Sequence, residues 1–318
     1  MSKKYHRRNR GRAVNGFFLL DKPGGITSNE ALQRVKRLFG AAKAGHTGSL
    51  DPLATGMLPI CFGEATKFSQ FMLDADKEYR TTLKLGVRTA SGDSDSEILA
   101  TRATAGLNEE KIEQALAQFR GEIEQVPSMY SALKHQGQPL YKLARQGVEV
   151  EREARKAQIF RLELLRFEAD ELELDIHCSK GTYVRTLADD LGEYLGCGAH
   201  VITLRRLGVG NLKASQMHRL DELEQISDQL QDRTERQQRL DAMLLPIAAM
   251  VENLPEVELS DLMTYYVKQG QPVFVPNTRA QGQVILFNKE ADAENRFLGV
   301  GEVLDDGRVA PRRLVTTG

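Results

Sequence analysis

The sequence predicts an α+β protein in which a mixed sheet flanked by helices is followed by a small C-terminal β-barrel. Apolar and polar residues alternate over 79–85, which is typical of a half-buried strand. Between such strands, apolar residues recur at helical spacing. Beyond residue 255, short apolar runs alternate with turn signals, which favours a small barrel.

The first elements can be placed by their end signals. A buried strand is expected over 16–20, and Thr27 and Glu30 then stand at the spacing of a capping box. This box predicts a helix that ends at Gly40, because glycine readily terminates helices. A second strand over 57–62 and a helix over 64–73 precede the alternating strand.

Further along, Asn108 precedes an amphipathic helix, strands are expected over 158–167 and 171–178, and a helix opens after Thr186. The chain then becomes helical and highly charged from 210 to about 239. A change of composition near residue 251 predicts a domain boundary. The predicted parts are a basic, flexible arm over 1–15, a main domain over 16–250, and the barrel over 251–318.

Composition restricts the kind of partner and cofactor. The 318 residues hold 43 Lys and Arg against 44 Asp and Glu, so total charge argues neither for nor against a polyanionic partner. The basic arm serves either as a solubilising segment or as a tether for RNA. Three separated cysteines indicate neither a disulfide framework nor a zinc site. No apolar run is long enough for a membrane span, so we expect a cytoplasmic protein.

No motif in the sequence predicts a metal or an organic cofactor. Gly24 and Gly25 lack the Lys-Ser/Thr ending of a phosphate-binding loop. Asp189 and Asp190 could suggest a metal site or a second catalytic acid. Because they follow the predicted start of a helix, where acids favour the positive end of the dipole, we interpret them as helix residues.

One carboxylate stands isolated in a glycine-rich loop. Residues 45–59 hold Asp51 among hydroxyl and apolar side chains, with no other charged group unless His46 is protonated. The glycines permit unusual backbone conformations, and Pro52 biases Asp51 away from helix. The segment is either a tight turn in which Asp51 caps neighbouring amides or a loop that presents an acid for chemistry.

The stretch over 45–56, Gly-His-Thr-Gly-Ser-Leu-Asp-Pro-Leu-Ala-Thr-Gly, resembles the catalytic motif of the TruB family of tRNA pseudouridine synthases. The resemblance extends to 21–28, 77–79 and 180–185 and covers nearly the whole chain. It implies a pseudouridine-synthase-like mixed sheet with a PUA-like C-terminal domain. It also implies conversion of uridine to pseudouridine at position 55, in the T arm of tRNA, without an obligatory protein partner.

The resemblance assigns three catalytic residues. Asp51 corresponds to the essential acid, Arg185 to the arginine that pairs with it, and Tyr79 to the tyrosine that stacks on the target base and is expected to help remove the C5 proton. Three roles for the acid remain open: attack on C1′, attack on C6, or removal of a proton from C2′. In each case the base must first be swung out of the folded RNA.

The resemblance also assigns four substrate-binding residues. His46 corresponds to a residue that enters the RNA loop in place of the displaced base, and Leu204 to an apolar contact with uracil. Lys22 and Tyr183 correspond to residues that form the pocket. Read without the family, each of these side chains could be an ordinary core or surface residue.

Aromatic and cationic residues interleave in the segment 127–150, which suits RNA because planar side chains stack on splayed bases. An ordinary surface helix is the alternative; in the family, the segment corresponds to an insertion that clasps the RNA stem-loop. The candidate RNA contacts are Tyr130, Lys134, Tyr141 and Arg145 here, and Arg312 and Arg313 near the C-terminus.

Two other functions remain open on the sequence. A non-catalytic protein that binds or folds tRNA could use the same cleft. A glycosylase that excises a nucleobase would also need base flipping and an acid, but it would have to admit water.

Overall fold

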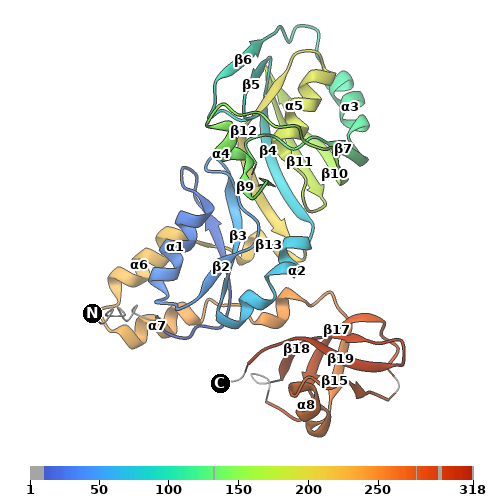
Figure 1. Cartoon of the computed structure of the whole chain (residues 1–318). Helices are drawn as coiled ribbons and strands as arrows, with labels where there is room; N and C mark the ends of the chain where they lie inside the picture. Colours follow the sequence, from blue (N-terminus) through green and yellow to red (C-terminus); the bar gives the residue numbers. More distant parts are fainter. Residues whose placement is uncertain (1–10, 132, 277, 293–295, 317–318) are drawn as a thin grey trace, which may run out of the picture.

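The structure, a computed structural model, describes residues 11–131, 133–276, 278–292 and 296–316. Its centre is a large mixed sheet with the strand order β14-β1-β3-β12-β4-β11-β10-β7 (Figure 1). The strands in this order are β14 (His218–Arg219), β1 (Gly16–Lys22), β3 (Thr55–Phe62), β12 (Ala199–Val209), β4 (Lys77–Leu85), β11 (Glu171–Cys178), β10 (Arg155–Glu168) and β7 (Gly121–Gln125). Two short strands extend it, β2 (Ala44–His46) on β3 and β13 (Leu212–Lys213) on β12. The predicted mixed sheet is therefore confirmed.

Helices cover one face of this sheet. Their apolar side chains join the strand residues in the largest core cluster. The helices are α1 (Ser28–Leu38), α3 (Glu109–Gln118), α5 (Val184–Tyr194), α6 (Leu220–Gln229) and α7 (Arg233–Asp241). Thr27 caps the first of them by accepting a hydrogen bond from the Glu30 amide, whereas the Glu30 carboxylate of the predicted capping box pairs with Arg34 instead. Asn108 caps α3 by accepting a hydrogen bond from the Lys111 amide. Local signals thus set the start of both helices.

The strands β1 and β3 are buried on both faces. Phe18 and Leu58 point into the helix-covered core, whereas Phe17 and Met57 belong to a second cluster. That second cluster also contains residues of α2 (Ser69–Asp74), of a 3-10 helix (Ile247–Met250) and of the C-terminal sheet. The large sheet and the C-terminal sheet therefore share a packed apolar core.

The C-terminal part is a five-stranded sheet that curls into a half-barrel like that of a PUA domain (Figure 1). Its order is β15-β17-β18-β19-β16, and its elements are β15 (Glu256–Leu259), α8 (Asp261–Lys268), β16 (Val273–Phe274), β17 (Gly282–Asn288), β18 (Phe297–Val303) and β19 (Arg308–Leu314). Its own core cluster packs α8 against the strands.

Two predicted helices differ from expectation. The helix over 64–73 is divided into a 3-10 helix (Gly63–Lys67) and α2, because the hydroxyls of Thr66 and Ser69 bond to backbone carbonyls three residues earlier. The stretch 210–239 does not become helical at once. It first forms β13, a 3-10 turn (Ala214–Gln216) and β14, which pairs with β1.

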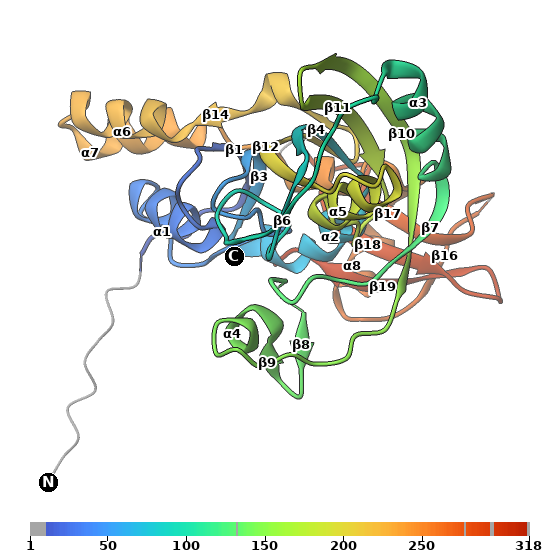
Figure 2. The same cartoon turned by 90° about the horizontal axis from the view of Figure 1, so that it is seen from above.

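Two segments leave the large sheet between its strands. One is the hairpin β5 (Val87–Thr89) and β6 (Ile98–Thr101). The other, hereafter the insertion, is the segment 126–154 between β7 and β10. It holds β8 (Lys134–His135), β9 (Gln138–Pro139) and α4 (Leu140–Ala144). Figure 2 shows these three elements standing away from the main sheet.

The predicted arm over 1–15 lies mostly outside the described residues. Of its last residues, Arg12 is bound to the body of the protein through a two-point contact with Asp241. The division at residue 251 stays a prediction.

Candidate active site

A cavity of about 310 Å³ opens beside Asp51. It gathers side chains from β4, β12, the Asp51 loop and the connection between β11 and α5. Five of the predicted site residues line it: Asp51, Tyr79, Tyr183, Arg185 and Leu204. This volume lies at the lower end of the range for small-molecule sites.

Backbone and hydroxyl contacts fix the Asp51 loop. The Ser28 hydroxyl exchanges hydrogen bonds with the backbone of Leu50, at 2.9 Å to its carbonyl and 2.8 Å from its amide. The Gly25 amide donates to the Pro52 carbonyl at 2.8 Å. The loop is therefore attached on both sides of Asp51, to the first residue of α1 and to the connection between β1 and α1.

Lys22 lies beneath this loop rather than in the cavity lining. It is fully buried, and its ammonium donates to the carbonyls of Pro23 and Ile26, at 2.8 Å each, and lies 3.4 Å from that of Pro52. Burial lowers the pKa of Lys22 to about 8, although the nearby Asp51 opposes the shift. Lys22 thus holds the backbone around the acid.

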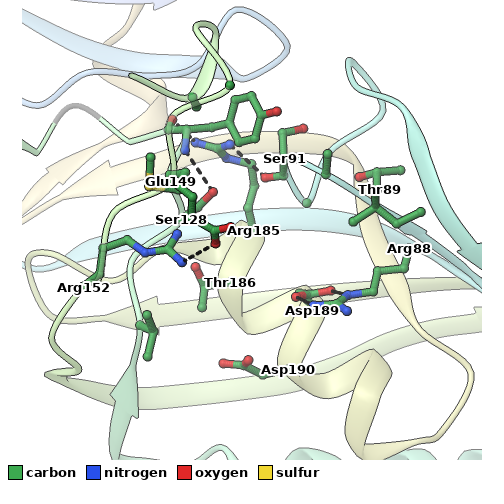
Figure 3. Close-up of a pocket in the computed structure, with 18 of the residues that line it drawn as sticks. Arg88, Thr89, Ser91, Ser128, Glu149, Arg152, Arg185, Thr186, Asp189 and Asp190 are labelled. Atoms are coloured by element: carbon green, nitrogen blue, oxygen red, sulfur yellow. Dashed lines mark hydrogen bonds and ion pairs between the residues drawn. The ribbon is translucent and has the colours of Figure 1, made fainter. Parts of the chain in front are cut away.

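Arg185 is the partner of Asp51. Its Nε lies 2.9 Å from the Asp51 carboxylate, and its Nη1 lies 3.5 Å from Asp93. Nη1 also donates to the Ser91 carbonyl at 2.9 Å and Nη2 to the Tyr130 carbonyl at 3.1 Å; Figure 3 shows Arg185 reaching from α5 toward Ser91. The guanidinium is thereby fixed from three segments of chain.

The two members of the pair differ in exposure. The Arg185 side chain is 7% exposed and that of Asp51 is 40% exposed, so the carboxylate can meet a ligand while its partner stays fixed. The pKa of Asp51 is raised above its usual value, chiefly by burial and further by the charge of Asp93. Arg185 and Lys22 oppose this shift. A partly desolvated carboxylate beside a fixed cation suits a nucleophile or a general base.

Tyr79 and Arg206 are cross-strand neighbours on β4 and β12. Burial raises the pKa of the Tyr79 phenol, and Arg206 partly opposes this shift, so the hydroxyl is neutral near pH 7. Leu204 lies two residues before Arg206 and adds an apolar side chain to the same cavity. The cavity thus combines an acid, a phenol and an apolar contact, which suits a flat, uncharged ligand.

Arg206 is a buried arginine on β12, 1% exposed, that connects β3 to the Asp51 loop. Its Nε donates to the Met57 carbonyl at 2.6 Å and its Nη2 to the Gly48 carbonyl at 3.0 Å. The strands approach closely here: at Gly56, with φ +95°, an added Cβ would lie 2.2 Å from the Arg206 carbonyl. Only glycine fits at that crossing.

We expect Arg206→Met to lower the free energy of unfolding by about 3 kcal/mol, because the buried Met57 carbonyl and the half-buried Gly48 carbonyl lose their donor. Thermal or urea unfolding measures the change. The matched control is Arg205→Met, because Arg205 is 40% exposed and pairs with Asp21 on the surface; its loss is about 1 kcal/mol or less. Equal losses for the two variants would contradict the anchoring role of Arg206.

The remaining predicted residues lie outside the Asp51 cavity. His46 is half-buried on β2, and its Nδ1 is buried without a hydrogen-bond partner among the residues that the structure describes; burial lowers the pKa of His46. Lys134 is exposed on the insertion, where the Arg145 guanidinium lies 5.8 Å from the centre of the Tyr141 ring. In the C-terminal sheet, Arg312 pairs with Glu302, and Arg313 donates to the Lys67 carbonyl.

A second cavity, of about 500 Å³, is also lined by Arg185. Figure 3 shows its charged lining, including the pair Arg88 and Asp189 and the neighbouring Asp190. Burial and the charge of Asp189 raise the pKa of Asp190 to about 6. Tyr130 lines this cavity rather than the first.

Sequence reasoning missed several residues that shape the site. Asp93 lies in a polar loop with two other acids, Asp95 and Glu97, close by in sequence, and nothing marks it as the one that faces Arg185. Arg206 adjoins the recognised Leu204, but arginine is rarely buried, so its place in the core was not foreseen. Lys77, inside a recognised motif, donates to three carbonyls at the end of α2.

Within the described ranges, no three His, Cys, Asp or Glu side chains cluster in a way that could hold a metal ion. None of the described helices is long and apolar enough to cross a membrane.

Comparison with solved structures gives the fold. The archaeal box H/ACA sRNP Nop10-Cbf5 complex contains a chain that matches 98% of this chain and 93% of its own length, with a TM-score of 0.70 and 22% identity. A chain of a Cbf5-Nop10-Gar1 complex matches equally well, with a TM-score of 0.70 and 24% identity.

Comparison with sequences gives the family. Residues 36–184 match the TruB family pseudouridylate synthase N-terminal domain, residues 185–252 the tRNA pseudouridylate synthase B C-terminal domain, and residues 255–315 the pseudouridine synthase II TruB C-terminal model. The tRNA pseudouridine synthase B of Tolumonas auensis is 56% identical over 98% of this chain and 95% of its own. That of Coxiella burnetii is 57% identical over 96% of both chains. The chain therefore belongs to the TruB family of tRNA pseudouridine synthases, which are isomerases that act on uridine in tRNA.

Proposed function

We propose that this enzyme converts uridine 55, in the T arm of tRNA, to pseudouridine, with Asp51 as the essential acid. The observation that carries the proposal is the contact of 2.9 Å between Arg185 and an Asp51 carboxylate that remains 40% exposed to a cavity. The reaction breaks the bond between ribose C1′ and N1, turns the uracil and joins C1′ to C5. The C5 proton leaves and N1 gains a proton, so no oxidant is required.

The residues around Asp51 suit the successive demands of this reaction. Arg185 orients the carboxylate for attack on C1′, attack on C6 or removal of the C2′ proton. Tyr79 and Leu204 offer planar and apolar surfaces to a uracil that has left the RNA stack. Because the phenol of Tyr79 is neutral, its oxygen can accept a hydrogen bond or pass on the C5 proton.

Features outside the cavity support an RNA substrate with a stem and loop. The insertion stands away from the sheet near the Asp51 cavity and carries Lys134, Tyr141 and Arg145 (Figure 2). These side chains suit stacking on bases and contacts with phosphates. We assign to the insertion the clasping of the T stem-loop, and to His46 the place of the extruded base. The PUA-like part adds RNA contacts, and cytoplasmic tRNA is the substrate.

The test uses unmodified tRNA transcripts and the full chain. We expect pseudouridine at position 55 alone, measured by mass spectrometry of nuclease fragments, and none with a transcript that carries cytidine there. Pseudouridine at another position would overturn the site assignment. Free uracil would indicate excision instead, and binding without product would indicate a tRNA-folding protein.

A further inference from the structure

The insertion leaves and re-enters the large sheet at a single cross-strand pair. Gln125, the last residue of β7, lies opposite Arg155, the first residue of β10. Gln125 is 2% exposed and lies outside the linings of both cavities near Arg185. A buried carboxamide requires partners for both its donor and its acceptor.

Both partners of Gln125 belong to one residue. Its Nε2 donates to the Tyr183 carbonyl at 3.2 Å, and its Oε1 accepts from the Tyr183 amide at 3.0 Å. Tyr183 is the N-cap of α5, and its side chain makes no capping bond. The carboxamide thus bonds to both the amide and the carbonyl of Tyr183, as the backbone of a paired strand would. It therefore fixes the backbone from which α5 begins.

The same stretch of chain touches the arginine partner of Asp51 directly. Arg185 lies two residues after Tyr183, and its Nη2 donates to the carbonyl of Tyr130, five residues after Gln125. Ser131, the next residue, lines the Asp51 cavity together with Tyr183. The chain that opens the insertion is therefore attached to both ends of the segment 183–185: Gln125 bonds to Tyr183, and Tyr130 bonds to Arg185.

We propose that Gln125 is a positioning residue that couples the seating of the insertion to the alignment of Arg185 with Asp51. A displacement of the insertion by bound RNA acts on Tyr183 through the carboxamide and on Arg185 through the Tyr130 carbonyl. The alignment of Arg185 with Asp51 then depends on the position of the insertion. This inference rests on the proposed function, since it takes RNA as the ligand of the insertion.

The test compares Gln125→Met, which keeps the length of the side chain and removes both hydrogen bonds, with wild type. We expect the single-turnover rate of pseudouridine formation to fall about 10- to 100-fold, as for a misplaced catalytic group. The affinity for tRNA should stay unchanged. A stability control, Leu223→Val in the buried face of α6, should lower the melting temperature and leave the rate of the folded enzyme unchanged.

A second background shows whether Gln125 acts through Arg185. In Arg185→Lys, the contact between residue 185 and Asp51 is already altered. Adding Gln125→Met to this variant should therefore lower the single-turnover rate only slightly further. An unchanged rate for Gln125→Met, or a tRNA affinity that falls as much as the rate, would overturn the inference. So would equal losses in both backgrounds. Failure of the proposed function looks different, because wild type itself would then form no pseudouridine.

Discussion

Asp51→Asn is expected to abolish pseudouridine formation, with a loss of at least about 10⁴-fold, which is typical when a group that takes part in bond-making is removed. Asparagine has nearly the same shape, but it supplies neither a charge nor a basic oxygen to the cavity. Arg185 would keep its contacts to the Ser91 and Tyr130 carbonyls. We therefore expect a folded protein that still binds tRNA. Product per enzyme after long incubation measures the loss.

The matched control is Asp241→Asn. The Asp241 side chain is 41% exposed, close to the 40% of Asp51, and it also pairs with an arginine, Arg12. Asp241 is distant from Asp51 in the sequence and is not one of the residues that line the Asp51 cavity. We expect wild-type activity from this variant. Comparable losses in the two variants would show that a general effect of removing a paired carboxylate, rather than chemistry at Asp51, explains the result.

The parts of the fold that the sequence predicted depend on short-range signals. Thr27 and Asn108 cap the helices that follow them, and the alternation over 79–85 becomes β4. These signals act within a few residues of each other. Taken together, these local signals predict the order of helices and strands, and that order predicts the fold class. The mixed sheet and the small C-terminal barrel could therefore be predicted without knowledge of contacts between distant residues.

The misplaced elements depend on contacts that the local pattern does not contain. The expected helix over 64–73 is interrupted where Thr66 and Ser69 bond to the backbone. The first residues after 210 form strands because an edge of the sheet is available to them at β12 and β1. Helical periodicity describes one face of a segment and says nothing about such edges.

The proposed catalytic pair, Asp51 and Arg185, was predicted through motifs, whereas the residues that support it were not. Asp51 and Arg185 each lie in a recognisable stretch, but two of the groups that hold the guanidinium are the backbone carbonyls of Ser91 and Tyr130, which leave no trace in the sequence. The burial of Arg206 likewise depends on the close crossing of strands at Gly56. Such positions can be found only once the strands are paired.

Arg185→Met is expected to remove activity and stability by two separable routes. Asp51 loses its orienting cation, and loss of such an electrostatic partner costs at least about 100-fold in rate. Asp93, whose side chain is 8% exposed, is left as a buried charge without its cation. Breaking a buried pair from one side lowers the free energy of unfolding by about 3–5 kcal/mol. Thermal unfolding and single-turnover kinetics measure the two losses independently.

A second substitution separates the two routes. Asp93→Asn, added to Arg185→Met, removes the stranded charge, and asparagine can still accept the hydrogen bonds from Ser91 and from the Asp95 amide. We expect the double variant to regain much of the lost stability and none of the lost activity. If activity returns together with stability, Arg185 would serve the fold alone, and its role beside Asp51 would have to be abandoned.

The residual activity of Arg185→Met should also depend more steeply on pH. Arg185 and Lys22 lower the pKa of Asp51, while burial and Asp93 raise it. Removing Arg185 therefore raises this pKa, and the ionised fraction of Asp51 falls at a given acidic pH. The acid limb of the rate profile should move to higher pH, so that the variant loses more activity in mildly acidic buffer than at neutral pH.

In the double variant with Asp93→Asn, part of this displacement should be reversed, because the substitution removes a charge that raises the pKa of Asp51. An acid limb that stays in place in both variants would mean that the ionisation of Asp51 does not control the reaction.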